Sequence, residues 1–392
     1  MKVGLYSGVL QRCPPDGYGA EVATWDLARA LACLGHTVTL AAPAGSRVPP
    51  GGSLVEIPLV AENGSPGGSW VAAEKGAAPD VVEAMRGCDV IHDLSCSTQV
   101  HVAACGPRGE CAIPHLYTAN GISWRDPAPP ARHNVVVVSH AARLAAAAGH
   151  DHWWGTPLSG TEGFPGPPIP ETRVVRYGCD LDFYRPSADY ERDLVVYIGR
   201  PHEHKGLSFL PLVARLLPDL RFVCAWGVTS LVHAKAVTYL EKKFDGVRNL
   251  TILALPPPGP GHHEAKRDLL ARAAVAIHPA TYLDACPRTV IEAQSCGVPV
   301  AAFDRGGVPE LVHPGRTGAL AMFPEGWPLG DSWESGAHAL AMSVRSALEM
   351  DREYVRRWAV AVHGAERMAR DYLALYGALA RGVRWGRGLT VS

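Results

Sequence analysis

The sequence lacks the features that would place the chain in a membrane or on nucleic acid. No apolar run reaches the roughly 18 residues of a membrane span. The first residues, MKVGLYSGVL, lack the long apolar stretch of a signal peptide. The formal net charge is −1, so no bulk charge attracts nucleic acid or an anionic membrane. We therefore expect a cytoplasmic protein with no nucleic-acid partner.

The cysteines and histidines lack metal-site spacing. The ten cysteines are scattered without a C-x-x-C pair, and reduced thiols are expected in a chain without a secretion signal. Two histidine groups stand out, His202 with His204, and His262 with His263 and Glu264. Neither has a second ligand pair at helical spacing. We expect polar loop residues at both places, no metal site and no cofactor.

The C-terminal stretch ARGVRWGRG is the one basic segment that suggests a surface contact. Three arginines, Arg381, Arg384 and Arg387, surround Trp385 there. The segment either touches a membrane or is a solvated end of the chain, and three charges contribute little to membrane binding. At most a peripheral membrane contact is expected.

The sequence does contain two runs of alternating strand and helix patterns. In the first, the strand KVGLYSG is followed by a Pro/Gly turn, the helical pattern EVATWDLARALACLG and the strand TVTLAAP. The second restarts near residue 187 with the strand DLVVYIG, the loop RPHEHKG and the helix LSFLPLVARLL. This order is typical of parallel, doubly wound sheets. The predicted fold is α/β, with two Rossmann-like domains that face each other across a cleft.

The predicted domains are residues 1–186 and residues 187–369, followed by a last helix at about 370–392; in the two-domain fold that the motifs below resemble, this helix packs back on the first domain. Residues 43–80 are rich in Pro, Gly and Ser and predict loops with one short strand. Residues 151–170 predict a long irregular loop with two adjacent tryptophans. These tryptophans either stack on a ligand or fix the loop to the core.

Two acidic residues, Asp284 and Glu292, flank a predicted helix start in LDACPRTVIEAQSCGVPVAAF. The strand before them ends at the sheet edge where parallel sheets bind ligands. Pro287 suits the first helical turn, and Gly297 with Pro299 predicts the helix end. The helix start favours a diphosphate, and a carboxylate suits the vicinal hydroxyls of a sugar. The ligand predicted is a nucleotide sugar; the alternative is that Asp284 caps the helix and Glu292 is solvated.

Two basic residues, Arg200 and Lys205, lie in the loop GRPHEHKG after the first strand of the second domain. That loop starts at the same sheet edge as the carboxylates. Alone, a basic loop is usually solvated. Together with the carboxylate pair, the two cations are expected to neutralise a leaving diphosphate.

These motifs resemble those of GT-B glycosyltransferases, specifically the large retaining glycosyltransferase family 4. The similar segments are GRPHEHKG, DACPRTVIEAQSCGVPVAAFDRGGVPELV and GYGAE, and the resemblance is strongest from Asp193 to about Leu320. It implies transfer of a hexose-type sugar from a nucleotide-diphosphate sugar to a hydroxyl acceptor, with retained anomeric configuration and no metal ion. The acceptor implied is a sugar, a lipid-linked molecule or a small molecule.

The resemblance also implies roles for individual residues. Arg200 and Lys205 would bind the donor diphosphate, Glu292 the ribose hydroxyls, and Asp284 the hydroxyls of the donor sugar. Of these, Arg200, Lys205 and Asp284 are the expected catalytic residues. Gly19 would let the first-domain loop approach the phosphate. The backbone that lines the donor sugar and phosphates would be Ala285, Cys286, Pro287 and Arg288.

The sequence departs from the family pattern at several positions. Asp284 and Tyr18 replace a usual glutamate and glycine, and Asn120 stands where a histidine is common near the reaction centre. Tyr177 replaces a usual asparagine. His92 matches a common histidine at a strand end, and either faces the acceptor or is a satisfied, partly buried histidine. Two other hypotheses therefore stay open: a sugar-nucleotide epimerase of GT-B shape, and a non-catalytic nucleotide-sugar binding protein.

Overall fold

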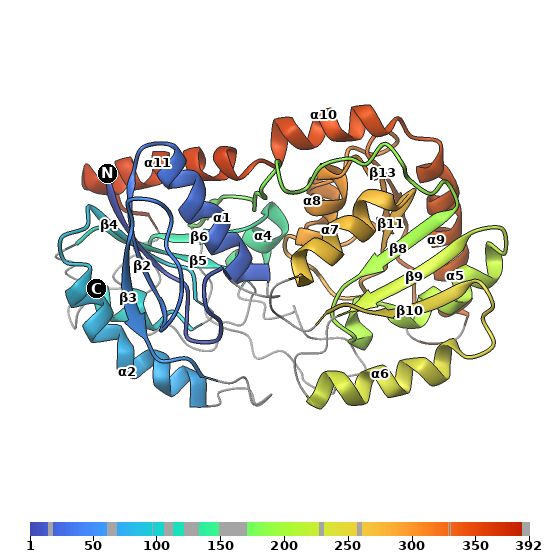
Figure 1. Ribbon diagram of the computed structural model, residues 1–392, viewed down its shortest axis with the longest axis horizontal. Helices are drawn as coiled ribbons and strands as arrows, with labels where there is room; N and C mark the ends of the chain where they lie inside the picture. Colours follow the sequence, from blue (N-terminus) through green and yellow to red (C-terminus); the bar gives the residue numbers. More distant parts are fainter. Residues whose placement is uncertain are drawn as a thin grey trace. The chain divides into compact units, whose positions relative to one another are not determined.

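The computed structural model divides the chain into two compact units (Figure 1). Among the described residues, the first unit comprises 1–148, 171–178 and 365–385, and the second comprises 179–364. The structure describes residues 1–14, 19–60, 69–95, 97–105, 113–120, 133–148, 171–226, 231–256, 261–327, 329 and 331–385. The loop expected over 151–170 and the residue Tyr18 lie outside this part of the chain.

The first unit has a parallel sheet in the order β3-β2-β1-β4-β5-β6-β7. The central strands are buried along their whole length, as expected for a parallel sheet covered by helices on both faces. The described strands of this sheet are β1 (Lys2–Tyr6), β2 (Thr37–Pro43), β3 (Ser53–Ile57), β4 (Val90–Asp93), β5 (His115–Ala119), β6 (Val135–Val137) and β7 (Arg173–Val174).

One helix of the first unit corrects the sequence analysis. The prediction of loops with one short strand over residues 43–80 was wrong at its C-terminal end, because α2 (Ser69–Ala84) begins there. Its residues Ala78 and Val81 are buried in the core of this unit, and that packing outweighs the helix-breaking effect of Pro79. The other described helices of the unit are α1 (Gly19–Cys33), α3 (Gln99–Cys105), α4 (His140–Ala148) and α11 (Ala365–Ala380).

The second unit repeats the same plan, with a parallel sheet in the order β10-β9-β8-β11-β12-β13. Its described strands are β8 (Leu194–Ile198), β9 (Arg221–Trp226), β10 (Leu250–Ala254), β11 (Val275–His278), β12 (Val300–Phe303) and β13 (Gly318–Ala321). Its described helices are α5 (Leu210–Leu216), α6 (Leu231–Phe244), α7 (His262–Arg272), α8 (Arg288–Ser295), α9 (Ser332–Leu348) and α10 (Arg352–Val362), with short 3₁₀ turns η2 (Glu203–Lys205), η3 (Leu207–Phe209) and η4 (Val308–Glu310). The expected α/β fold with two Rossmann-like domains is confirmed.

The C-terminal tail ends in the core of the first unit. Trp385 is buried, and its indole N–H donates a hydrogen bond of 2.9 Å to the carbonyl of Val135. This aromatic ring therefore offers no surface to a membrane, and Arg387 lies outside the described residues. Within the described part of the chain, no helix is both long and apolar enough to span a membrane. The eight cysteines described there are free thiols, as predicted.

Candidate functional site

The predicted site residues of the second unit lie where its strand order reverses. β8 and β11 are neighbours in the sheet, although three helices and two strands separate them along the chain. Ligands of open parallel sheets bind beyond the carboxyl ends of the strands at such a point. The loop after β8 contains Arg200 and Lys205, and the loop after β11 contains Asp284.

Lys205 and Asp284 form a largely buried ion pair. The ammonium Nζ of Lys205 lies 2.9 Å from Oδ2 of Asp284, and the two side chains are only 16% and 12% exposed. The hydroxyl of Tyr282 accepts a hydrogen bond from Lys205 and donates one to Asp284. Nε2 of His278, at the end of β11, lies 3.7 Å from the same carboxylate. The structure thus brings together two predicted residues that stand far apart in the sequence.

The electrostatics of this group keep the carboxylate ionised. Burial alone would raise the pKa of Asp284, but Lys205, His278 and the Tyr282 hydroxyl outweigh it and lower the pKa to about 2. Burial lowers the pKa of Lys205, an effect that Asp284 opposes and nearby Arg200 reinforces. Burial also lowers the pKa of His278 to about 4. At neutral pH the group therefore contains an ionised Asp284 and a neutral His278.

Glycines allow the two loops to close on one another. Gly206 has φ +76°, and a Cβ added there would stand 1.7 Å from the carbonyl oxygen of Pro279. Gly306 has φ +62°, and its Cβ would stand 2.6 Å from the carbonyl oxygen of Asp284. That oxygen accepts a hydrogen bond of 2.7 Å from the N–H of Gly307. Backbone packing, and not only charge, therefore fixes the positions of Lys205 and Asp284.

Glu292 lies inside α8 and is 1% exposed, so the alternative of a solvated glutamate is excluded. Its Oε1 lies 3.0 Å from Nζ of Lys266 and 3.5 Å from Nε of Arg288. Burial alone would raise the pKa of Glu292, but Lys266 and Arg288 outweigh it and lower the pKa. The second oxygen, Oε2, is buried and has no hydrogen-bond partner among the described residues. An acceptor in that position is suited to a donor group of a ligand.

The helix α8 has an uncapped N-terminus. It begins at Arg288, its N-cap residue is Pro287, and no side chain caps it. Asp284 therefore does not cap this helix, so both parts of the alternative interpretation, a capping Asp284 and a solvated Glu292, are excluded. Gly297, at φ +70°, follows the helix as predicted. The residues expected to line the donor, Ala285, Cys286, Pro287 and Arg288, are all buried.

Arg200 is the exposed member of the predicted donor site. Its carbonyl oxygen accepts a hydrogen bond of 3.2 Å from the Tyr197 hydroxyl, which holds the start of the loop. Lys266, from α7, is the residue that sequence reasoning missed. It pairs with Glu292 from a separate helix, and no local motif connects the two residues.

In the first unit, Gly19 is the exposed first residue of α1, and Asn120 follows β5. The amide of Asn120 donates a hydrogen bond to the carbonyl of Leu94. Its Oδ1 accepts a hydrogen bond of 2.9 Å from the Tyr177 hydroxyl. Two positions at which the sequence departs from the family pattern are therefore hydrogen-bonded to each other.

His92 corrects the suggestion that this residue faces an acceptor. Its imidazole is 0% exposed, with Nδ1 2.7 Å from the Tyr376 hydroxyl and Nε2 2.7 Å from Oγ1 of Thr118. Burial lowers its pKa to about 3, so the ring is neutral at physiological pH. The position fits the other alternative, a buried histidine with both nitrogens satisfied.

Part of the expectation for the two histidine groups is wrong: His202 is an exposed loop residue, as predicted, but the others lie in helical turns. His204 is a buried residue of η2, and its carbonyl accepts a hydrogen bond of 2.9 Å from the N–H of Thr281. His262, His263 and Glu264 form the first turn of α7, and His262 is buried. His204 joins the loops after β8 and β11 through its carbonyl, and His262, His263 and Glu264 begin α7.

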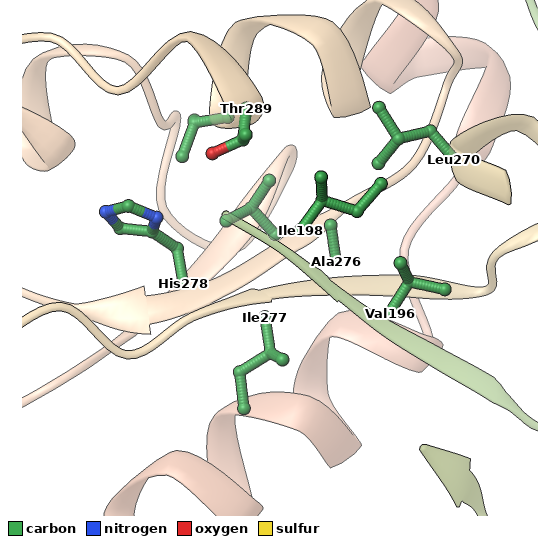
Figure 2. A pocket seen from close by; sticks show the side chains of 9 residues that line it. Val196, Ile198, Leu270, Ala276, Ile277, His278 and Thr289 are labelled. Atoms are coloured by element: carbon green, nitrogen blue, oxygen red, sulfur yellow. The ribbon is translucent and has the colours of Figure 1, made fainter. Parts of the chain in front are cut away.

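A small, mainly aliphatic pocket lies between β8, β11 and α8 (Figure 2). Figure 2 shows His278 and Thr289 at one end of it, with Leu270 and Val196 at the other. Its aliphatic walls offer little to a charged ligand, so this pocket is packing space beneath the helix. The predicted site residues Arg200, Lys205 and Asp284 lie outside it, on the loops after β8 and β11.

Comparison with known proteins agrees with this geometry. Residues 192–328 match the model of the family glycosyl transferases group 1. A D-inositol 3-phosphate glycosyltransferase of Mycolicibacterium paratuberculosis is 30% identical over 159 residues, which are 38% of this chain. The chain spans only 35% of the length of that relative.

Solved structures share the fold over nearly the whole chain. AviGT4, a glycosyltransferase involved in avilamycin A biosynthesis, has a TM-score of 0.67 and 21% identity, and covers 98% of this chain and 99% of its own. Anabaena HepE in complex with UDP and glucose has a TM-score of 0.64 and 17% identity, and covers 96% of this chain and 100% of its own. At these identities the likeness establishes the GT-B fold and nothing finer.

Proposed function

We propose that the protein is a glycosyltransferase, because residues 192–328 match the model of the family glycosyl transferases group 1 and the chain has the GT-B fold. It moves a sugar of hexose type from a nucleotide-diphosphate sugar to a hydroxyl group of an acceptor. The acceptor is a sugar, a lipid-linked molecule or a small molecule, and the proposal includes a cytoplasmic location.

The observation that supports this function most is the ion pair of Lys205 and Asp284 on the loops after β8 and β11, with buried Glu292 on the helix α8 that follows. Lys205, with Arg200 on the same loop, supplies positive charge for the diphosphate. Asp284 supplies an ionised carboxylate for hydroxyls of the donor sugar. Glu292 offers its buried Oε2 to the ribose hydroxyls. The backbone from Ala285 to the start of α8 lines the space between them.

In the proposed mechanism, Arg200 and Lys205 stabilise the negative charge that develops on the leaving diphosphate. Preorganised charges are effective there because they need no rearrangement as the bond breaks. The acceptor hydroxyl attacks from the face that the diphosphate leaves, so the anomeric configuration is retained. We therefore propose no protein nucleophile and no catalytic metal. Gly19 and Asn120 belong to the unit that would receive the acceptor.

The test is a transfer assay on the purified protein with a panel of nucleotide sugars and simple hydroxyl acceptors. UDP-glucose is tested first, because HepE, of the same fold, is in complex with UDP and glucose. The anomeric proton of the product is followed by NMR, with and without EDTA. The expected result is a glycoside with the configuration of the donor, formed at an unchanged rate in EDTA.

Three outcomes would contradict parts of the proposal. An inverted product would exclude same-face attack, and loss of activity in EDTA that only added metal restores would exclude metal-independent transfer. Release of an epimerised nucleotide sugar, without transfer, would identify an epimerase instead.

A further inference from the structure

Four side chains with metal-binding chemistry meet in the interior of the first unit. His101 and Cys105 come from α3, His115 begins β5, and His133 stands just before β6. His101, Cys105 and His115 are each 1% exposed, and His133 is 8% exposed. Burying three imidazoles and a thiol together is unusual, because aliphatic side chains would fill the same space at a lower desolvation cost.

Donor atoms of His101, Cys105 and His115 lie close together, and His133 approaches the same thiol. His101 and Cys105 are four residues apart, so both lie on one face of α3. Sγ of Cys105 lies 3.1 Å from Nε2 of His115 and 3.8 Å from Nε2 of His133. One ligand atom from each of His101, Cys105 and His115 lies within 4.8 Å of the other two.

These separations bracket those of a tetrahedral zinc site. With Zn–S of about 2.3 Å and Zn–N of about 2.0–2.1 Å, a tetrahedron places sulfur and nitrogen about 3.6 Å apart. The two measured sulfur–nitrogen distances, 3.1 and 3.8 Å, lie on either side of that value.

Hydrogen bonds orient the imidazoles for this role. Nδ1 of His115 lies 3.1 Å from the carbonyl of Ile113, so it must be protonated to donate, and Nε2 presents its lone pair toward Cys105. Nε2 of His101 lies 3.1 Å from the carbonyl of His133, which leaves the lone pair on Nδ1. Metal-binding histidines usually donate their other N–H to a carbonyl or carboxylate in this way.

We propose that His101, Cys105, His115 and His133 form a structural zinc site. Thiolate and imidazole ligands suit Zn²⁺, whereas Mg²⁺ and Ca²⁺ take oxygen ligands. A set of four buried protein ligands is typical of a structural site, because a catalytic zinc keeps a position open for water or substrate. Binding releases the Cys105 thiol proton to solvent as the Zn–S bond forms. The site lies in the first unit and does not depend on the proposed transfer activity.

The experiment measures metal in full-length protein without an affinity tag, by inductively coupled plasma mass spectrometry. About one zinc ion per chain is expected after purification. Stripping the metal with a chelator is expected to lower the Tm by several degrees, and added zinc restores it. Cys105→Ala is expected to lose at least 90% of the bound zinc. Its matched control is Cys224→Ala, a buried cysteine of β9 in the second unit, which keeps full occupancy.

Cobalt titration of the stripped wild-type protein keeps the test independent of how well Cys105→Ala folds. A thiolate-to-cobalt charge-transfer band that saturates at about one equivalent, and that zinc abolishes, is the expected result. The proposal is overturned if stripped protein takes up neither metal stoichiometrically, because the four side chains then form only a hydrogen-bonded thiol–imidazole cluster. It is equally overturned if Cys105→Ala folds and retains the cobalt band.

Discussion

The two units treat buried ionisable groups in opposite ways. In the second unit two buried carboxylates have cationic partners: Asp284 pairs with Lys205, and Glu292 with Lys266. In the first unit, buried Glu74 and His92 are hydrogen-bonded to hydroxyl groups instead. Burial raises the pKa of Glu74 to about 8, although a hydrogen bond from Ser97 opposes it. The second unit therefore keeps charge at its sheet edge, and the first removes it.

This difference indicates where a ligand is expected. A buried ion pair gains little stability, since desolvation of the two ions offsets their attraction. Its presence at the carboxyl edge of β8 and β11 is explained better by a charged, hydroxyl-rich ligand. The neutral groups around His92 fix packing within the first unit, because each polar atom has a partner in the protein.

The largest effect expected is on turnover in Lys205→Met. Loss of a preorganised positive charge should reduce kcat by about 100-fold or more. The substitution also leaves Asp284 buried without its ion-pair partner, which should cost about 3–5 kcal/mol of unfolding free energy. Lys243→Met is the matched control, since Lys243 forms an exposed pair with Glu203. Near-normal turnover in folded Lys205→Met would remove Lys205 from the diphosphate site.

Alanine substitutions at two glycines with the same backbone conformation test whether close packing at Gly206 fixes the loop after β8. Gly206 and Gly246 have φ of +76° and +74°, but only at Gly206 would a Cβ collide with backbone. Gly246→Ala should cost about 1–2 kcal/mol for the left-handed conformation alone. Gly206→Ala should cost about 1–3 kcal/mol more for the collision with Pro279. Urea denaturation measures both, and equal costs would show that the loop yields and does not fix Lys205.

Sequence alone could predict the repeated α/β plan, because apolar strands and helical patterns alternate in both halves. It could not predict α2, since Pro79 and its glycine-rich surroundings favour loops until buried contacts outweigh them. The carboxylates of the donor site were visible because they lie in one local segment. Lys266 was not, because its pairing with Glu292 exists only once α7 and α8 pack together.

The proposed zinc ligands show the same limit. Only His101 and Cys105 form a local pattern, H-x-x-x-C on a helix, and the other two ligands follow at irregular spacings. Local spacing in the sequence therefore does not reveal His115 and His133 as ligands. The fold brings them together by placing α3, β5 and the start of β6 in contact.

A pH titration of stability sharpens the comparison for the first unit. His92 has a folded pKa of about 3, below the ordinary value of about 6.5, so between these pH values the unfolded chain binds a proton that the folded chain does not. Its contribution to stability is therefore complete above pH 6.5. Below pH 6.5 this contribution decreases by about 1.4 kcal/mol for each pH unit, until the pH reaches about 3. Urea denaturation at several pH values should show a shallower slope in His92→Gln than in the exposed control His338→Gln. Identical slopes would contradict the buried neutral state.

The smallest effect expected is the coupling between Asn120 and Tyr177. Their hydrogen bond of 2.9 Å joins two neutral groups, so a double-mutant cycle of Asn120→Ala and Tyr177→Phe should give about 0.5–1.5 kcal/mol. Unfolding free energies of the two single variants and the double variant supply the value. Strict additivity would mean that the two positions do not act as a unit.

The central claim is that the loops after β8 and β11 bind a nucleotide diphosphate. It is tested most directly by measuring the binding of UDP, GDP, ADP and TDP with thermal stabilisation and calorimetry. At 100 times its dissociation constant, a ligand specific for the folded state adds about 2.7 kcal/mol of stability. The account predicts stabilisation by one of these nucleotides, with affinity at least about tenfold weaker in Glu292→Gln and unchanged in the exposed control Glu334→Gln. Stabilisation by none of them, or equal affinity in Glu292→Gln, would contradict a nucleotide-diphosphate site on the loops after β8 and β11.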